Sequence, residues 1–348
     1  MSDKPRENSP ADPDCSADRK SAQPDRPRRR GLRVVLISVA SFAVFLGAVA
    51  AGGYLFINHM TGSIQRIPVK FTKLDAANRP AGYSDYGGAM TVLITGEDFG
   101  PTGNGEIGGP YPSGLIMLLH VNASGYNGGV VSIPPQSIVN VPGHGRMRLE
   151  DALKIGGPSL LVQTVQDLTH VQINHYARID FDHVDQVVNV MRGVDVTLPD
   201  MTDSYGHVFH VGVNDLNGMT ALDYAREPNL TEEQRVLRQQ SLMRAVVRKL
   251  VHRHLLRNPL TGYRVLHALV SMLTVDSNFT TGELEHLATE IRGLTGSADY
   301  VTAPVRYVGG QVRLDRRITR QLWAAIRQDA ITAFAEKYPF TVTPAAPR

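Results

Sequence analysis

Two arginines and a glutamine in the segment EEQRVLRQQ, residues 232–240, have the types and spacing of an anion-binding group. Arg235, Arg238 and Gln239 stand at positions i, i+3 and i+4, so on a helix they share one face. Arg226 lies just upstream in LDYAREPN, before a proline that is expected to end a helix. Guanidinium groups bind phosphate oxygens in pairs. The pattern alone does not separate such a pocket from a solvated helix face, because charged residues usually face water.

Asp98, in TGEDFG after an apolar run, is a candidate metal ligand. A carboxylate at the end of a strand suits a hard cation such as Mg²⁺, and a solvated loop aspartate is the alternative interpretation. The sequence has no Gly-x-Ser-x-Gly nucleophile elbow and no Gly-x-x-x-x-Gly-Lys-Ser/Thr phosphate loop. The histidines of HVFH and HRH lack the spacing of metal ligands. Asp98 and the arginines are therefore the residues that remain for chemistry.

The elements that must position these residues alternate between strands and helices. Short apolar segments bounded by Gly and Pro predict buried strands at 89–96, 114–121 and 128–134. Helical spacing follows at 156–170 and 181–193, with further strands predicted in INHYARIDF and GVDVTLPD. Strands that alternate with helices favour an α/β fold with a layered sheet.

The second half of the chain is richer in helices. A short helix is predicted at 217–226, and a longer one begins at Thr231, in a Thr-x-x-Gln capping box, and runs to about Leu256. Thr280 begins another capping box before LEHLATEIRGL. A strand in YVTAPVRYV and a last helix at about 318–337 complete one domain without internal repeats.

The first 33 residues differ from the rest, with nine Lys/Arg, six Asp/Glu and many Pro and Ser, which is typical of a disordered tail. Removing them from the totals of 36 Lys+Arg and 33 Asp+Glu leaves 27 of each. This neutral remainder argues against a nucleic-acid-binding surface on the folded part. The single cysteine, Cys15, lies in the tail, so disulfides are excluded from the rest, as is common in bacterial envelope proteins.

Residues 34–57 contain no charged side chain and exceed the roughly 20 residues that a helix needs to cross a bilayer. Arginines cluster just before this segment, so the positive-inside rule places the tail in the cytoplasm and everything after Asn58 outside. A cleaved signal peptide is the alternative, since AVA at 48–50 resembles a cleavage site. The long preceding region and the length of the apolar run favour a single-pass anchor in a bacterial cell membrane.

From Thr91 to Gln240, and more loosely to about Asp329, the sequence resembles the LytR-CpsA-Psr proteins of bacterial envelopes, whose domain is also called a cell envelope-related transcriptional attenuator. Six segments match the family's motifs in order: TVLITGEDFG, GLIMLLHV, VVSIPPQS, RLEDALKIGG, LNGMTALDYAR and EEQRVLRQQ. The resemblance implies a single three-layer α/β/α domain with a mixed central sheet behind one transmembrane helix. We divide the chain into a cytoplasmic tail at 1–33, the transmembrane helix at 34–57, a linker with short structure at 58–85, the extracytoplasmic domain at 86–338 and a tail at 339–348.

The same resemblance implies a function. Members of the family transfer glycopolymers from polyprenyl-pyrophosphate carriers to peptidoglycan, with Mg²⁺ as cofactor, so these carriers, peptidoglycan and the membrane are the expected partners. Nucleic acid is not an expected partner. The implied pyrophosphate-binding residues are Arg226, Arg235, Arg238 and Gln239. Asp98 is the implied metal ligand, and the implied catalytic residues are Asp98, Arg148 and Arg226.

The sequence departs from the family's pattern at several charged positions. Family arginines are replaced by Gly100, Pro112, Pro135 and Pro228. Gly114 replaces a second metal-binding aspartate and Gln136 an acid, so Mg²⁺ binding is expected to be weak or absent. The candidates for a replacement ligand are Glu97, Glu106 and Glu150.

Two functions from different classes follow from these observations. One is a phosphotransferase that attaches a wall polymer to peptidoglycan through Asp98 and the three arginines. The other is a catalytically impaired homologue, a pseudoenzyme, that binds a lipid-linked intermediate or a partner in envelope assembly. A DNA-binding regulator is disfavoured, because the folded part is neutral, is predicted to lie outside the membrane and carries no DNA-reading motif.

Overall fold

The computed structural model describes residues 62–71, 89–98, 111–122, 128–180, 183–227, 230–252, 259–294 and 299–343. The chain divides into two compact units, Met1–Leu55 and Phe56–Arg348, and every described residue belongs to the second. The predicted tail at 1–33 and the predicted transmembrane helix at 34–57 lie outside the described residues. Within the described part, no helix combines the length and the apolar composition needed to cross a membrane.

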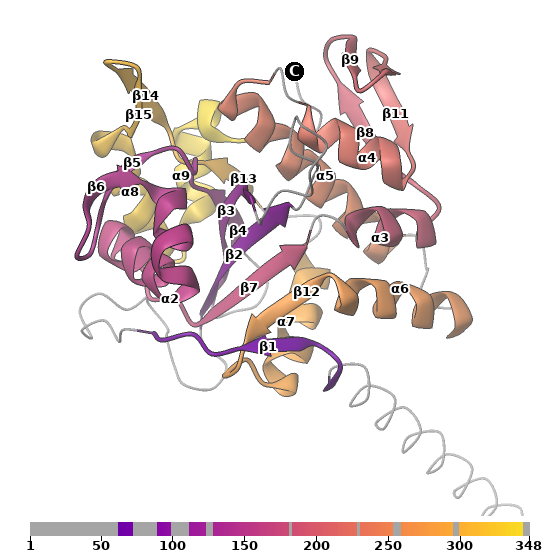
Figure 1. Ribbon diagram of the computed structural model, residues 1–348, viewed down its shortest axis with the longest axis horizontal. Coiled ribbons are helices and arrows are strands. Elements are labelled where there is room, and N and C mark those ends of the chain that lie inside the picture. The colour runs from indigo at the N-terminus through magenta and orange to yellow at the C-terminus, as the bar shows by residue number, and fades with distance from the viewer. Residues whose placement is uncertain are drawn as a thin grey trace, which may run out of the picture. The chain divides into compact units, whose positions relative to one another are not determined.

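A mixed sheet of seven strands forms the centre of the second unit, in the order β1-β12-β7-β2-β3-β4-β13 (Figure 1). Its strands are β1 (Gln65–Ile67), β2 (Met90–Asp98), β3 (Tyr111–Val121), β4 (Gly128–Ser132), β7 (His175–Asp180), β12 (Leu273–Asp276) and β13 (Asp299–Thr302). In the middle of the sheet, β2 runs parallel to β7 and antiparallel to β3. The edge strand β1 lies in the segment predicted as a linker and pairs in parallel with β12.

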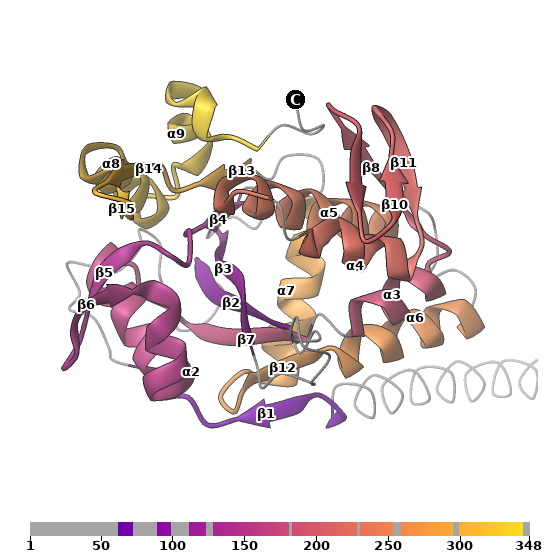
Figure 2. The same ribbon diagram turned by 45° about the horizontal axis from the view of Figure 1, so that its top comes forward.

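Helices cover both faces of this sheet, as Figure 2 shows. Side chains alternate between the faces, so Met117 packs into one hydrophobic cluster and its neighbour Leu118 into the other. One cluster contains residues of α3 (Val184–Val190), α4 (Gly218–Arg226), α5 (Glu232–His252), α6 (Pro259–Ser271) and α7 (Thr281–Leu294). The other contains residues of α2 (Leu149–Thr169), α8 (Arg316–Arg327) and α9 (Ile331–Lys337). The predicted α/β domain with a mixed central sheet is confirmed, in three layers.

Several helix limits differ from the prediction. α2 begins at Leu149 rather than near Gly156, and Gly157 (φ 64°) interrupts its helical backbone next to Pro158. The predicted last helix is two helices, α8 and α9, because Asp329 adopts a left-handed conformation (φ 52°) between them. Asp329 Oδ1 lies 2.8 Å from Nε2 of the buried His120 in β3, which ties this break to the sheet.

Both predicted capping boxes are confirmed. The Thr231 N–H donates to Gln234 Oε1 at 3.0 Å, and the Gln234 N–H donates back to Thr231 Oγ1 at 3.3 Å. Thr280 and Glu283 make the same reciprocal pair, at 2.8 and 3.3 Å. Each box satisfies backbone donors that the first turn of α5 or α7 leaves free.

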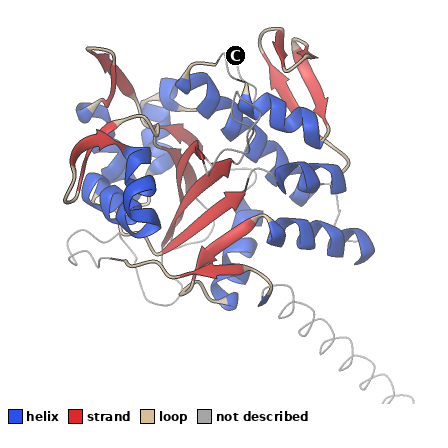
Figure 3. Ribbon diagram, in the orientation of Figure 1, coloured by secondary structure: helices blue, strands red, loops and turns tan. Residues whose placement is uncertain are grey.

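Four small two-stranded sheets, which the sequence patterns did not predict as such, lie beside the central sheet (Figure 3). They are β5–β6 (Ile138–Val141 and Gly145–Arg148), β8–β11 (Val194–Leu198 and Gly212–Leu216), β9–β10 (Thr202–Ser204 and His207–Phe209) and β14–β15 (Val305–Val308 and Gln311–Leu314). Gly309 (φ 57°) and Gly310 (φ 74°) form the two-residue turn between β14 and β15, where both positions need positive φ. Beyond α9, the Thr343 N–H donates to the Tyr300 carbonyl at 2.7 Å, so the predicted tail begins with residues that contact the sheet.

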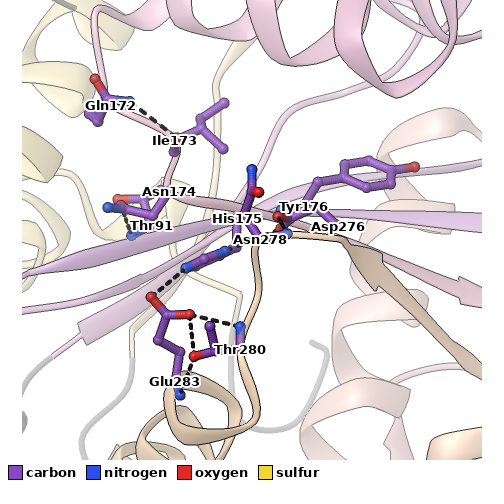
Figure 4. A network of polar contacts seen from close by, with 10 residues as sticks. All are labelled: Thr91, Gln172, Ile173, Asn174, His175, Tyr176, Asp276, Asn278, Thr280 and Glu283. Atoms are coloured by element: carbon purple, nitrogen blue, oxygen red, sulfur yellow. Dashed lines mark hydrogen bonds and ion pairs between the residues drawn. The ribbon is translucent and has the colours of Figure 1, made fainter. Parts of the chain in front are cut away.

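A polar network joins β7, β12 and α7 at one end of the sheet (Figure 4). Nδ1 of the buried His175 lies 3.2 Å from Asp276 Oδ2, and its Nε2 lies 3.6 Å from Glu283 Oε1. The ring of Phe279 stacks on the imidazole, with centroids 3.9 Å apart. His175 is the first residue of β7, whereas Asp98 is the last residue of the parallel strand β2. The network therefore stabilises the end of the sheet remote from Asp98.

Candidate functional site

Arg238 lies in the corner between α4 and α5, where it is 9% exposed. Its Nη1 donates to the Tyr224 carbonyl at 3.3 Å and to Glu227 Oε2 at 2.5 Å. The guanidinium carbon lies 5.1 Å from the centroid of the Tyr224 ring. The guanidinium is thus fixed against the end of α4 by packing and hydrogen bonding, and the alternative interpretation, a solvated helix face, does not describe this residue.

Glu227 is the buried counter-ion of Arg238. Only 5% of it is exposed, and both of its carboxylate oxygens accept from Thr202 Oγ1 in β9, at 3.1 and 3.2 Å. A buried charge is tolerated when it is paired and hydrogen-bonded. The sequence motifs did not predict a role for Glu227, although its position directly after Arg226, beside a predicted cationic pocket, was a usable signal.

Three further polar atoms of these helices are buried and have no hydrogen-bond partner among the described residues: Tyr224 Oη, Gln239 Oε1 and Ser241 Oγ. Burial raises the pKa of Tyr224 to about 12, and the charge of Arg238 opposes this shift. The Ser241 hydroxyl lies near the Tyr224 hydroxyl and also lowers the pKa of Tyr224, but the two groups do not have the geometry of a hydrogen bond. Buried polar groups are usually hydrogen-bonded, so unused capacity beside Arg238 suits a polar ligand.

Gln240 positions α5 on the sheet. This fully buried residue donates from Nε2 to Ser132 Oγ in β4 at 2.5 Å and to Thr302 Oγ1 in β13 at 3.3 Å. Its Oε1 accepts from Thr343 Oγ1. Because Gln240 holds the helix at three points, Arg238 and Gln239 have a fixed place relative to the sheet.

Asp98 ends β2 at the carboxyl edge of the sheet, paired in register with Tyr111 of β3. The neighbouring residue Glu97 pairs with Pro112 of β3 and with Asp180 of β7. The backbone therefore places Asp98 next to the strand that carries Gly114, where the resemblance expects a second metal-binding aspartate. The side chains of this β2–β3 end lie outside the described part, and the described side chains contain no group of three or more His, Cys, Asp or Glu able to hold a metal ion.

The remaining predicted residues lie in two places. Arg226 ends α4 and Arg235 lies in the first turns of α5, so their backbones flank the corner that holds Arg238, while their side chains are outside the described part. Arg148 ends β6, which Figures 1 and 2 place on the side of the domain opposite α4 and α5. Its side chain is 56% exposed and lies 3.5 Å from Glu150 at the start of α2. The structure does not bring Arg148 together with Arg238.

The loop after β4, where the motif expects an arginine, has a structural role instead. Pro135 is buried, and its carbonyl accepts the N–H of Glu150 at 3.0 Å. The Ser137 carbonyl accepts the N–H of Leu149, also at 3.0 Å. These carbonyls accept hydrogen bonds from backbone N–H groups in the first turn of α2, which would otherwise lack partners, because the side chain of the capping residue Arg148 accepts none.

Comparison with known proteins identifies the family. The sequence profile of the LytR_cpsA_psr family matches residues 59–311. The chain belongs to the LytR-CpsA-Psr family. The match includes the corner between α4 and α5 and the β2–β3 end of the sheet, but not α8 and α9.

Individual LytR-CpsA-Psr relatives agree with this assignment. The chain is 31% identical over 204 residues to the "Probable cell wall biosynthesis protein LcpB" of Corynebacterium glutamicum, covering 58% of this chain and about half (49%) of LcpB. It is 28% identical over 213 residues to the "Polyisoprenyl-teichoic acid--peptidoglycan teichoic acid transferase TagU" of Enterococcus faecalis, covering 60% of this chain and 67% of TagU. The solved "LytR-Csp2A-Psr enzyme from Actinomyces oris" shares the fold, with a TM-score of 0.59 and 19% identity over 76% of this chain and 96% of that one.

Proposed function

We propose that this protein binds a polyprenyl-pyrophosphate-linked glycopolymer at the corner between α4 and α5 and acts in its transfer to peptidoglycan. The observation that carries the proposal is the buried, fixed guanidinium of Arg238, with Gln239 beside it, in a LytR-CpsA-Psr domain. TagU, to which this chain is similar, is named for the transfer of a polyisoprenyl-linked teichoic acid to peptidoglycan. A guanidinium that is already fixed loses little conformational freedom when it binds phosphate.

Three arginines lie on the two helices that meet at this corner: Arg226, Arg235 and Arg238. Glu227 is the carboxylate that pairs with Arg238. Arg238 would either exchange Glu227 for a phosphate oxygen or bind both, since a guanidinium has five N–H donors.

A Mg²⁺ ion fits this chain only in part. Asp98 supplies one carboxylate position at the end of β2, and Gly114 supplies none on β3. Mg²⁺ accepts one or two carboxylates together with substrate phosphates, so Asp98 would hold the ion only when the substrate completes its coordination. Bound in this way, Mg²⁺ would neutralise phosphate charge. We assign no step of the reaction to it.

A catalytically impaired homologue is the second candidate function, and specific observations favour it. Pro135 is buried and supports α2 where the motif has an arginine, and Arg238 is already neutralised by Glu227. Losing positive groups that stabilise developing charge costs a few kcal/mol each, which slows phosphoryl transfer by orders of magnitude. Such a protein would bind the lipid-linked intermediate, or a partner in envelope assembly, without turnover.

The proposed function requires the domain to lie on the outer side of a bacterial cell membrane. The apolar segment at 34–57, with arginines on its amino-terminal side, supports an anchor with a cytoplasmic amino terminus.

Binding of farnesyl pyrophosphate to the full-length protein, measured by calorimetry, tests the proposal. We expect Arg238→Ala to weaken binding by about tenfold or more, since a charge-assisted hydrogen bond contributes about 1.5–3 kcal/mol. Arg264→Ala, an exposed arginine of α6, is the matched control and should bind as the wild type does. Equal affinities of the two variants would refute the pyrophosphate site. Turnover of a lipid-linked donor onto peptidoglycan then separates the transferase from the impaired homologue.

A further inference from the structure

A cavity of about 1140 Å³ lies between the β5–β6 hairpin, the carboxyl end of α2, the β14–β15 hairpin and α8. We call this cavity the α8 groove. Figures 1 and 2 show these elements gathered on the side of the domain opposite α4 and α5. Among the described residues, seven arginines and two aspartates line the groove, a formal excess of five positive charges in a folded part whose total charge is balanced. α8 lies beyond the residues that the family profile matches.

The cations of the groove are largely uncompensated. On α8, Arg316, Arg317 and Arg320 are exposed and make no side-chain hydrogen bond or salt bridge with any described residue. The same holds for Arg146 of β6. The buried face of α8, which includes Leu322, packs into the hydrophobic cluster, so the helix presents its arginines to the groove. Like charges this close repel one another, so an unliganded cluster of this size is electrostatically unfavourable.

The two aspartates do not neutralise this cluster. Asp315 Oδ2 accepts from Arg306 Nε at 2.6 Å, and its Oδ1 accepts the N–H of Arg317 at 3.0 Å, so this carboxylate is occupied by a salt bridge and by capping α8. Asp167 is exposed at the end of α2. One aspartate remains for six arginines.

Two arginines in the groove are built into the domain rather than spread over its surface. Arg327 Nη1 donates to the Thr169 carbonyl at 2.6 Å, and burial lowers the pKa of this arginine. Arg313 donates from Nη2 to Gln311 Oε1 at 2.9 Å, but its Nε is buried and has no partner among the described residues. A buried N–H donor without a partner is uncommon in folded proteins and fits a bound acceptor.

We propose that the α8 groove binds a linear polyanion, namely a phosphodiester polymer without nucleobases. The arginines come from α8 and from both hairpins, so they are spaced to contact several phosphates of one chain rather than a single ion. Arginine is suited to phosphate oxygens because its planar fork donates two hydrogen bonds at once.

The shape and lining of the groove argue against two other polyanions. A concave site does not fit the flat surface of an anionic membrane. Single-stranded nucleic acid is usually held by bases stacked on several exposed aromatic side chains. The described lining offers no exposed Phe, Tyr or Trp, since Trp323 is only 5% exposed, and its one exposed ring is the imidazole of His170. The groove needs no lipid carrier and uses no residue of the α4–α5 corner, so this inference goes beyond the proposed function.

The test is binding of fluorescently labelled poly(glycerol phosphate) to the full-length protein at a series of salt concentrations. We expect the triple variant Arg316→Gln/Arg317→Gln/Arg320→Gln to bind about tenfold more weakly, from three exposed ion pairs. Its salt dependence should have a slope smaller by about two, since each lost phosphate contact lowers the slope by roughly 0.7. The triple variant should unfold at or above the wild-type temperature, because these side chains make no hydrogen bond or salt bridge within the described part of the chain and their mutual repulsion is removed.

A matched control removes the same charge elsewhere. Lys70→Gln/Arg192→Gln/Arg264→Gln changes three exposed cations outside the groove and should leave polymer affinity within about twofold of the wild type. Equal losses in both triple variants would refute the groove as the site. Single-stranded DNA with the same number of phosphates is the second ligand to test. If it binds as tightly as the polymer and its affinity falls as much in the α8 variant, the ligand of the groove is a nucleic acid and the proposal is wrong. If the α8 variant loses binding to phosphatidylglycerol vesicles but not to the polymer, the ligand of the groove is a membrane surface and the proposal is wrong.

Arg238→Ala separates this inference from the proposed function. That variant should bind the carrier-free polymer as the wild type does, because Arg238 lies outside the groove lining. Failure of the pyrophosphate experiment would therefore leave the groove prediction standing. If Arg238→Ala weakens polymer binding as strongly as the α8 variant does, the groove is not an independent site.

Discussion

Glu227 and Arg238 form a buried ion pair, in which Glu227 Oε2 lies 2.5 Å from Arg238 Nη1. The arginine that the family motif assigns to a pyrophosphate is thus neutralised within the protein. Glu227 is itself held by Thr202, so it cannot leave without breaking further hydrogen bonds. An anionic ligand must compete with this carboxylate, which makes Glu227 a determinant of affinity.

Glu227→Gln should strengthen pyrophosphate binding while lowering stability. The amide keeps the shape and can still accept from Thr202, but it removes the negative charge that competes with the ligand. We expect farnesyl pyrophosphate to bind about tenfold more tightly, which corresponds to about 1.4 kcal/mol. Calorimetry measures the affinity, with Glu285→Gln as an exposed control on α7. Unchanged or weaker binding would show that Glu227 does not face the ligand.

A double-mutant cycle should show that the pair is coupled. Arg238→Ala alone leaves Glu227 buried without its cation, which costs about 3–5 kcal/mol. Glu227→Gln in the same chain removes that charge, so the double variant should be more stable than Arg238→Ala by more than about 1 kcal/mol. Denaturant unfolding of the four proteins measures the coupling. Additive effects would mean that the two charges do not interact in solution.

The sequence predicted the local features of this site well and its long-range partners poorly. Arg238 and Gln239 follow a helical period, and the Thr231 capping box sets the start of α5, so residues three or four positions apart carried the signal. Gln240, in contrast, binds β4, β13 and Thr343, which are distant in sequence, and no pattern within a short window shows such contacts.

The same distinction explains the α8 groove and the divided last helix. Each arginine of α8 fits a solvated helix face by itself, and only packing against the β5–β6 and β14–β15 hairpins makes a cavity. The apolar period runs through α8 and α9, whereas Asp329 breaks the helix and contacts His120, far away in the sequence. Periodicity predicts which face is buried, but not where a tertiary contact ends a helix.

Tyr224 should make the stability of the domain sensitive to alkaline pH. Its pKa is raised from 10.0 to about 12 in the folded state, so the folded state retains the proton longer than the unfolded state does. This contribution to stability is fully present below pH 10 and is lost as the pH rises through 12, by up to about 3 kcal/mol. Tyr224→Phe should flatten this decline when unfolding is followed between these limits, whereas Tyr307→Phe, on the exposed β14, should not. An identical decline in the wild type and in Tyr224→Phe would contradict the assignment.

The amino terminus should lie in the cytoplasm and the domain outside it. Arginines precede the apolar segment at 34–57, and the residues just after it carry few charges. A reporter enzyme that is active only outside the cytoplasm, fused after Arg348, should therefore be active. A fusion at Arg33 serves as the control and should be inactive. A stable but inactive fusion at Arg348 would reverse the topology.

Glycopolymer transfer should be much slower than in a relative that carries the full set of motif charges, if it occurs at all. Phosphoryl transfer depends on positioning and on stabilisation of negative charge, and this chain lacks charged groups that the motif supplies at Gly114 and Pro135. The two positions differ in how a charge can be restored. Pro135 is buried, and an arginine there would bury a cation in the loop that supports α2. Gly114 lies on β3, beside the end of β2 that carries Asp98.

Gly114→Asp alone is therefore the sharper test. A second carboxylate on β3, near the end of β2 that carries Asp98, should raise Mg²⁺ affinity and raise the transfer rate by about tenfold or more. Gly114→Asn, of similar size to the aspartate but neutral, should do neither. The measurements are Mg²⁺ binding and turnover of a lipid-linked donor onto peptidoglycan, with Asp98→Ala as the variant that removes the remaining ligand. Wild-type turnover equal to that of a full-motif relative, abolished by Asp98→Ala, would mean that this chain is an enzyme whose site is completed by residues other than those of the motif. Undetectable turnover in both the wild type and Gly114→Asp, with pyrophosphate binding intact, would favour the protein that binds the intermediate without transferring it.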